Sequence, residues 1–272
     1  MAAVRSAAIQ RAIDWDDECN SAARALAVSA HRTVAPRAPL VVAHRATMGH
    51  APENTLRGLH AGLALGVDGI EIDVQLSADG VPVLLHDNTL DRTTNGTGPL
   101  SSTTFADLRE LDAGAGEQVP ALSEALAVVV PTALLVIEVK AAPDQAPDAV
   151  VEAVLHDVRA AATQRVWLWS FDGALLEALA RLAPSLPIAH LCRSVTSEVR
   201  ARVQRLGLAG VSIAEVDESV VQELRRQGLA VFCWTKNDPP DLARLVRLPL
   251  SGIVSDYPER VQAARARAGE ES

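Results

Sequence analysis

Short apolar runs rich in Val, Ile and Leu recur from residue 40 onward, and helix-length segments separate most of them. A strand buried on both faces is typically such a continuous run, whereas a surface helix repeats its apolar positions every three or four residues. Strands are therefore expected at 40–43, 68–74, 81–85, 133–139, 165–169, 187–191, 210–213, 229–234 and 251–254. Helices are expected at Thr55–Leu65, Pro147–Ala162, Gly173–Leu182, Ser197–Leu206 and Glu218–Gln227.

This alternation of strands and helices is typical of an α/β protein with a parallel sheet covered by helices. Eight or nine strands, with a helix after most of them, is the count of a closed (β/α)8 or TIM barrel. The chain of 272 residues is long enough for one such barrel, which takes about 250 residues. We expect the barrel domain to cover residues 39–272.

Two segments depart from the alternation. Residues 1–38 are Ala-rich, and their apolar positions Ala8, Ile9, Ala12 and Ile13 share one helix face, which predicts an N-terminal helical extension that packs on the main body. Residues from Asn88 to about Gln118 are rich in Thr, Ser, Asn and Gly and are too long for an ordinary strand-to-helix connection. We expect this insertion to shape a pocket at the barrel mouth, with Asp87 and Arg92 organising it.

The charge balance excludes one class of partner. The net charge is −9 and the pI about 5.3, whereas proteins that bind nucleic acid usually carry clustered Lys and Arg. Nucleic acid is therefore not an expected partner, but a few local cations can still hold a small phosphate-containing molecule. The oligomeric state is left open by the sequence.

Cysteine usage and hydropathy favour a cytoplasmic protein. Cys19, Cys192 and Cys233 are odd in number and form no CxxC pair, so we expect neither a disulfide framework nor a thiolate zinc site. The first residues lack the apolar core of a signal peptide, and no run approaches the ~18 apolar residues of a membrane span. No integral membrane association is expected.

Charged residues stand at the ends of four apolar runs, as His44-Arg45, Glu71-x-Asp73, His86-Asp87 and Glu138-x-Lys140. Such groups cost several kcal/mol in a buried sheet unless they meet a partner or a cation. Residues two apart on a strand project from the same face. Glu71 and Asp73 can therefore reach one point, and so can Glu138 and Lys140. Carboxylate oxygens favour Mg²⁺ or Ca²⁺ over Zn²⁺. This pattern predicts an oxygen-ligand metal site beside an acid/base pair, which suits cleavage of a phosphate ester.

The same residues belong to an ordered set of motifs. From residue 40 the chain resembles the glycerophosphodiester phosphodiesterases in these pieces: HRA (44–46), APENT (51–55), GVDGIEIDVQLSADGVPVLLHDNTLDRTTNGTG (66–98), VPAL (119–122), VIEVK (136–140), WSFD (169–172), FCWT (232–235) and IVSDYP (253–258). Each piece is weak alone, but their order and separation make the resemblance specific.

The resemblance implies a metal-dependent barrel that hydrolyses glycerophosphodiesters to sn-glycerol 3-phosphate and an alcohol, with residues 88–118 as the family's insertion after the second strand. In that family the glycerol 2-hydroxyl is thought to attack phosphorus, forming a cyclic phosphate that water then opens. By position, the implied roles are acid/base catalysis for His44 and His86, phosphate contacts for Arg45 and Lys140, and metal ligation for Glu71, Asp73 and Glu138.

Other positions have two interpretations at this stage. Glu53 and Asn54 either cap the following helix or support the site from behind the ligands, and Trp234 either walls the pocket against glycerol or packs in the core. Asp256 is expected as a helix cap. Ala46 departs from the glycine that usually follows His-Arg in the family, and its methyl group is expected to narrow the pocket floor.

Two further functions remain as alternatives to hydrolysis of small glycerophosphodiesters. One is phospholipase D-type action on lysophospholipids, which needs an apolar trough that the polar insertion does not supply. The other is a barrel that binds a phosphodiester without cleaving it, although all the polar residues that catalysis needs are present.

Overall fold

The computed structural model describes residues 38–270, and its centre is a nine-stranded sheet. The strands are β1 (Leu40–Ala43), β2 (Gly69–Leu76), β3 (Pro82–Leu84), β4 (Leu134–Val139), β5 (Val166–Ser170), β6 (Ile188–Cys192), β7 (Gly210–Ile213), β8 (Ala230–Cys233) and β9 (Gly252–Ser255). Every predicted strand is present, with its ends shifted by two residues at most.

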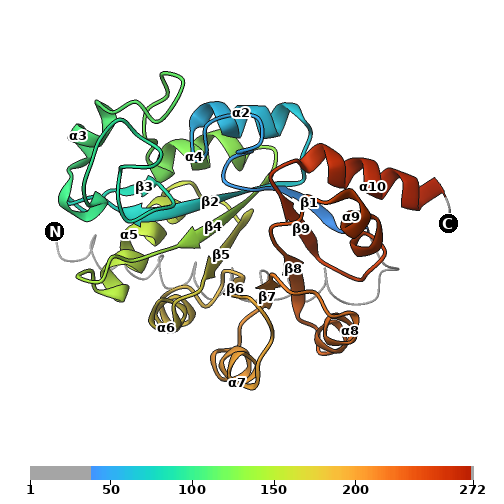
Figure 1. The fold of residues 1–272 in the computed structure, drawn as a ribbon. Coiled ribbons are helices and arrows are strands. Elements are labelled where there is room, and N and C mark those ends of the chain that lie inside the picture. Colours follow the sequence, from blue (N-terminus) through green and yellow to red (C-terminus); the bar gives the residue numbers. More distant parts are fainter. Residues whose placement is uncertain (1–37, 271–272) are drawn as a thin grey trace, which may run out of the picture.

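Eight of these strands close into a parallel barrel. The sheet order is β1-β9-β8-β7-β6-β5-β4-β2-β3, and β1 also pairs with β2, so the barrel contains every strand except β3 (Figure 1). The chain is therefore a TIM barrel, as the alternation predicts.

Strand β3 is antiparallel to β2, which differs from the wholly parallel sheet that was expected. The link Ser77–Val81 is a tight turn, in which Gly80 has a φ of +79° and Ser77 N–H donates to Val81 O at 3.0 Å. A parallel neighbour would need a crossover of a dozen or more residues, so a link this short can only return antiparallel.

Helices surround the barrel strands, apart from α3 (Phe105–Arg109), which lies in the insertion (Figure 1). The helices are α2 (Leu56–Ala64), α3 (Phe105–Arg109), α4 (Leu122–Val129), α5 (Pro147–Ala160), α6 (Gly173–Leu182), α7 (Ser197–Leu206), α8 (Glu218–Arg226), α9 (Pro239–Leu245) and α10 (Pro258–Glu270), with a short 3-10 turn at Leu100–Ser102. The five predicted helices are α2 and α5–α8. The pattern missed the others: α3 and α9 are short, and α10 buries only a narrow strip.

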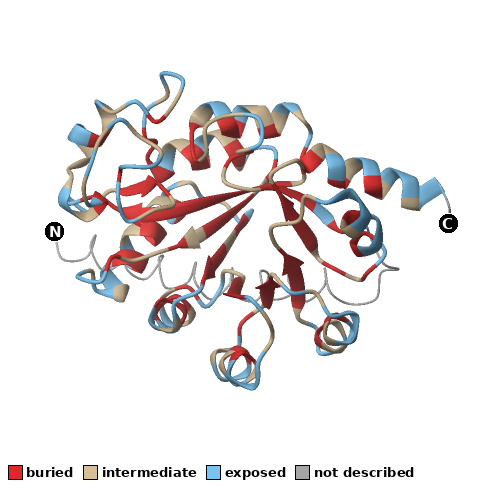
Figure 2. Cartoon of the chain, viewed as in Figure 1, coloured by how far each residue is buried: buried red, intermediate tan, exposed pale blue. Residues whose placement is uncertain are grey.

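Two apolar layers hold this arrangement together. One fills the barrel interior, with Val42, Val136, Trp169 and Phe232 among its members, and the other lies between the strands and the helices. Figure 2 shows the strands buried along most of their length. Burial on both faces explains why the strands could be predicted as continuous apolar runs.

The insertion has a small apolar core of its own and lies beyond β3, at the left of Figure 1. Leu90, Leu100, Leu108 and Val119 pack there with Val83 of β3. The segment expected as a polar loop is therefore folded around a third apolar cluster.

Two expectations fall partly or wholly outside this description. The predicted extension over 1–38 lies outside the described residues apart from Ala38, as does Cys19. Within residues 38–270, no helix combines the length and the apolar character that crossing a membrane requires.

Candidate active site

The charged residues singled out from the sequence gather within β2, at the carboxyl ends of β1 and β4, and just after β3. Apolar residues of β2 such as Ile70 and Ile72 pack outward against the helices, so Glu71 and Asp73 face the barrel interior. In the β2–β4 pairing, Asp73 stands opposite Glu138. Strand register therefore brings three carboxylates from two strands to one place.

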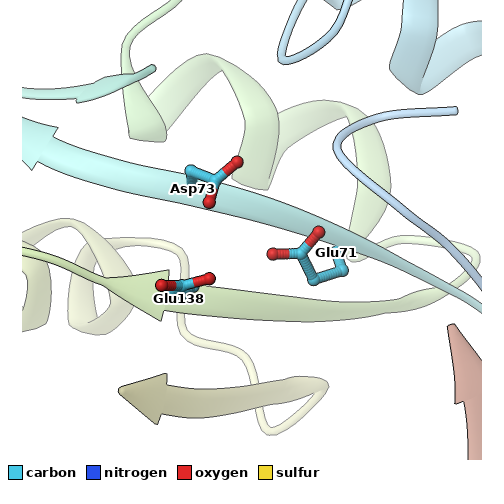
Figure 3. A group of neighbouring side chains, drawn as sticks. All are labelled: Glu71, Asp73 and Glu138. Carbon is cyan, nitrogen blue, oxygen red and sulfur yellow. The ribbon is translucent and has the colours of Figure 1, made fainter. Parts of the chain in front are cut away.

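Glu71, Asp73 and Glu138 point toward one another (Figure 3). Each offers an oxygen within 4.8 Å of the others, and Glu71 and Asp73 are almost fully buried. Ca²⁺ binds oxygen at about 2.3–2.6 Å, so two oxygens that bind one ion are separated by at most about twice that distance. The spacing of these three oxygens falls within this limit. Burial and the neighbouring Asp73 and Glu138 carboxylates raise the pKa of Glu71 well above its ordinary value, and burial raises the pKa of Glu138 to about 7. These groups fit a divalent cation, which would offset their repulsion.

Asp73 differs from the other two carboxylates because protein groups already surround it. Lys140 Nζ lies 2.7 Å from its Oδ1, and Asn54 Nδ2 donates to its Oδ2 at 2.8 Å. Although burial raises its pKa, Lys140 and other nearby cations lower it overall. Asn54 also accepts from the Asp73 backbone N–H, whereas the cap of α2 is Thr55. Asn54 therefore supports Asp73 rather than capping the helix.

Each of the two histidines is held by an aspartate through Nδ1. His44 Nδ1 lies 2.6 Å from Asp256 Oδ1, and His86 Nδ1 lies 2.6 Å from Asp87 Oδ1. The pKa of both aspartates is lowered, so they are ionised acceptors and each Nδ1 must carry the proton. In the neutral rings Nε2 is then left as the acceptor. Both rings line one cavity at the barrel mouth, which Arg45, Glu71 and Glu138 also line.

Asp256 was expected as a helix cap, and this expectation is wrong. Its carboxylate accepts from His44 and from Asn237 Nδ2 at 2.6 Å. No local sequence pattern indicates this contact, since His44 lies 212 positions away. The signal that could have found it is the place of Asp256 directly after the last strand, where the barrel closes beside His44.

Arg45 begins a loop with a left-handed backbone. Arg45, Ala46 and Thr47 have φ values of +45°, +56° and +64°. The loop brings Arg45 N–H to Glu71 Oε2 at 2.9 Å and Arg45 Nη1 to Glu53 Oε1 at 3.4 Å. Ala46 is fully buried against Gly58 of α2 and is not among the residues that line the cavity, so its methyl group does not narrow the pocket as expected.

Aromatic and aliphatic side chains form the other side of the cavity. Trp234 lies among them, its Nε1 donates to Ser212 O at 3.1 Å, and its ring meets that of Phe171 at 5.4 Å and 85°. Phe171, 44% exposed, was not singled out from the sequence. The cavity also contacts Trp169, Leu191 and Val254. Its volume is about 90 Å³; a larger hollow of about 600 Å³ between α7 and α8 is not lined by any of these charged groups.

Comparison with known proteins agrees with this geometry. Residues 44–260 match the Glycerophosphoryl diester phosphodiesterase family. A glycerophosphodiester phosphodiesterase of Caldanaerobacter subterraneus is 32% identical over 81% of this chain and 95% of its own length. One of Bacillus subtilis is 29% identical over 86% of this chain and 88% of its own length.

A solved structure of an Oleispira antarctica phosphodiesterase, in complex with the product sn-glycerol-3-phosphate, superposes with a TM-score of 0.80. It is 32% identical in sequence, and the match covers 84% of this chain and 97% of that one. A glycerophosphodiester phosphodiesterase from Agrobacterium tumefaciens matches with a TM-score of 0.71 and 27% identity, over 83% of this chain and 99% of its own. Because the family match spans most of the sequence and these relatives align over nearly their whole lengths, the chain is a member of the glycerophosphodiester phosphodiesterase family.

Proposed function

We propose that the protein hydrolyses small glycerophosphodiesters to sn-glycerol 3-phosphate and an alcohol, with a divalent metal and two histidines. The observation that carries this proposal is the cluster of Glu71, Asp73 and Glu138 within 4.8 Å, flanked by two imidazoles that line the same cavity. The relatives named for this activity and the phosphodiesterase structure with its glycerol phosphate product support the same reaction.

Glu71, Asp73 and Glu138 would hold Mg²⁺ or Ca²⁺, since their oxygen-only donor set suits both ions. A divalent cation bound there supplies Lewis-acid polarisation of a phosphate oxygen and orients the attacking hydroxyl. Arg45 would contact the phosphate. Lys140, which pairs with Asp73, would stabilise the negative charge that develops on the phosphate oxygens during the reaction.

The histidines would move the protons. Burial lowers the pKa of His86, and Asp87 fixes its proton on Nδ1, so Nε2 is a free acceptor at neutral pH. His86 would take the proton of the glycerol 2-hydroxyl while that oxygen bonds to phosphorus. His44, held by Asp256, would protonate the departing alcohol as its P–O bond breaks. Water would then add to the cyclic phosphate and break its bond to the 2-oxygen, which regains a proton.

The test is a coupled assay for glycerol 3-phosphate with glycerophosphocholine and glycerophosphoethanolamine, in Mg²⁺, Ca²⁺ or EDTA. Turnover that requires metal supports the proposal. Binding of the diester without release of glycerol 3-phosphate would favour the non-catalytic barrel. Faster turnover of lysophosphatidylcholine than of glycerophosphocholine would favour the phospholipase D-type activity.

A further inference from the structure

Arg92 of the insertion contacts two carboxylates at once. Its Nε and Nη2 donate to the two oxygens of Asp87 at 2.6 and 3.0 Å. Its Nη1 and Nη2 donate to the two oxygens of Glu53 at 2.8 and 2.7 Å. One guanidinium therefore makes two paired contacts, a geometry that its planar fork of donors allows and that an ammonium cannot reproduce.

The two carboxylates lead to different parts of the candidate site. Asp87 Oδ1 also accepts from His86 Nδ1 at 2.6 Å, and Glu53 Oε1 lies 3.4 Å from Arg45 Nη1. Arg92 is thus one side chain removed from a group assigned to proton transfer and from a group assigned to phosphate contact. Its own guanidinium does not line the cavity.

Arg92 lies outside the apolar core of the insertion. That core contains Leu90, Leu100 and Leu108, whereas Arg92 is 46% exposed and directs its side-chain hydrogen bonds to Asp87 and Glu53. Glu53, by contrast, is only 9% exposed. Bidentate contacts to a largely buried carboxylate and to Asp87 have a defined geometry, so they fix where both carboxylates lie beside Arg45 and His86.

We infer that Arg92 is a positioning residue for catalysis, which orients His86 through Asp87 and Arg45 through Glu53. The inference rests on the proposed function. Without Arg92, the Asp87 carboxylate keeps only its contact to the His86 ring and can turn together with that ring. The His86 imidazole then loses its fixed orientation toward the substrate. The hydrogen bonds that hold Glu53 beside Arg45 are lost at the same time. The insertion thus supplies the side chain that aligns His86 and Arg45 with each other.

The experiment compares R92A and R92K with R109A. Arg109 is a matched control, because it also lies in the insertion and also pairs with a carboxylate, Glu124, at 3.0 Å, but away from the cavity. We expect kcat to fall about 100-fold in R92A, the size of a misplacement of about 1 Å, with KM changed less. R92K should recover only part of this loss, since an ammonium cannot make both paired contacts. R109A should stay within twofold of the wild type in kcat.

A double-mutant cycle tests the route through Asp87. If Arg92 acts through Asp87, D87N and R92A together should lose less than the product of their separate losses. Added guanidinium at non-denaturing concentration should restore part of the R92A activity, because the site of Arg92 is open to solvent. Melting temperature and circular dichroism of each variant are measured alongside.

The outcomes separate this inference from the proposed function. If the wild type cleaves no glycerophosphodiester, the proposed function fails. If the wild type is active but R92A keeps kcat within threefold, or R92A and R109A lose activity equally, or the losses of D87N and R92A multiply, Arg92 is not a positioning residue. A folded R92A with a selective loss of kcat, partly restored by guanidinium, supports the inference.

Discussion

The two sides of the barrel mouth are built in different ways. The polar side is formed by His44, Arg45, Glu71, His86 and Glu138, which lie within β2, at the ends of β1 and β4, and just after β3. Hydrogen bonds and ion pairs hold these groups. The aromatic side, formed by Trp169, Phe171, Leu191, Trp234 and Val254, belongs to β5, β6, β8 and β9 or the residues that follow them. Its members are held mainly by packing.

For the proposed reaction, this difference predicts a division of labour within one cavity. The polar side carries opposite charges at close range, which is what proton transfer and phosphate contact require. The aromatic side offers ring surface and few charges, which suits the carbon skeleton of a glycerol unit or head group. Changes on the polar side should therefore lower kcat, and changes on the aromatic side should mainly raise KM.

The largest expected effect is on the polar side. His86→Ala should lower kcat by about 10³-fold, because acid/base groups contribute 10²- to 10⁴-fold. The fold should persist, since the His86 side chain is 32% exposed. The coupled glycerol 3-phosphate assay measures this loss. His50→Ala is the control: His50 pairs with Glu259 at 3.0 Å outside the cavity and should keep full activity. A kcat within tenfold of the wild type in His86→Ala would remove the proton-transfer role.

Glu71→Gln should separate metal binding from stability. The amide can still accept from Arg45 N–H, but it cannot ionise, so it avoids the cost of burying a carboxylate beside Asp73 and Glu138. In EDTA the melting temperature of the variant should therefore exceed that of the wild type, by about 2–4 °C for each kcal/mol of this cost avoided. Activity with metal should fall about 100-fold through the lost ligand.

Thermal melts in EDTA and in rising Mg²⁺ or Ca²⁺ measure this contrast. The wild type should gain more from metal than Glu71→Gln does. Glu152→Gln, an exposed change on α5, should respond as the wild type. An equal response of Glu71→Gln and wild type to either metal would show that Glu71 is not a ligand.

The pH dependence should follow the two proposed ligands with raised pKa values, Glu71 and Glu138, and Glu138 sets its midpoint. The Glu138 pKa of about 7 lies above the ordinary 4.5, so the folded protein without metal binds this proton more tightly than the unfolded chain does. That stabilisation is complete below about pH 4.5 and is lost as pH rises through 7. Metal must displace each proton, so its affinity should fall by up to about tenfold per pH unit for each one below its pKa. Calorimetric titration at pH 6, 7 and 8 measures this slope, and Glu138→Gln should reduce it, because only the proton of Glu71 then remains to be displaced.

The polar side could be predicted from the sequence because charge in an apolar strand has a high cost. Glu71 and Asp73 interrupt a run that is otherwise apolar, so their positions alone indicate a site that offsets this cost. The closed barrel also followed, since each parallel strand is a continuous apolar run. Strand β3 was predicted in place but not in direction, because direction depends on the short turn that precedes it.

The aromatic side gave no comparable signal. A ring at a strand end is ordinary in a core, so Trp234 had two interpretations and Phe171 none, although both stand in motifs of the family resemblance. Long-range partners were equally hidden: the contact of His44 with Asp256 depends on barrel closure, and that of Arg92 with Glu53 depends on the path of the insertion. Local patterns predict elements and charged sites, but these contacts follow from the closed fold.

The smallest expected effect tests the aromatic side directly. Trp234→Leu keeps an apolar side chain but removes the ring that meets Phe171 at 5.4 Å. A substrate group that packs on the Trp234 ring loses a contact worth about 0.5–1.5 kcal/mol. KM for glycerophosphocholine should therefore rise about two- to tenfold, while kcat stays within about twofold. Steady-state kinetics on the purified variant measure both constants.

The matched control for that change is Trp167→Leu. Trp167 lies in β5 and packs against Phe232 at 5.1 Å in the barrel interior, and it does not contact the cavity. Trp167→Leu should lower the melting temperature without altering KM, because the ring that it removes packs in the barrel interior and does not line the cavity. If Trp234→Leu instead lowered kcat and left KM unchanged, the aromatic side would take part in the reaction itself, and the division between the two sides would fail.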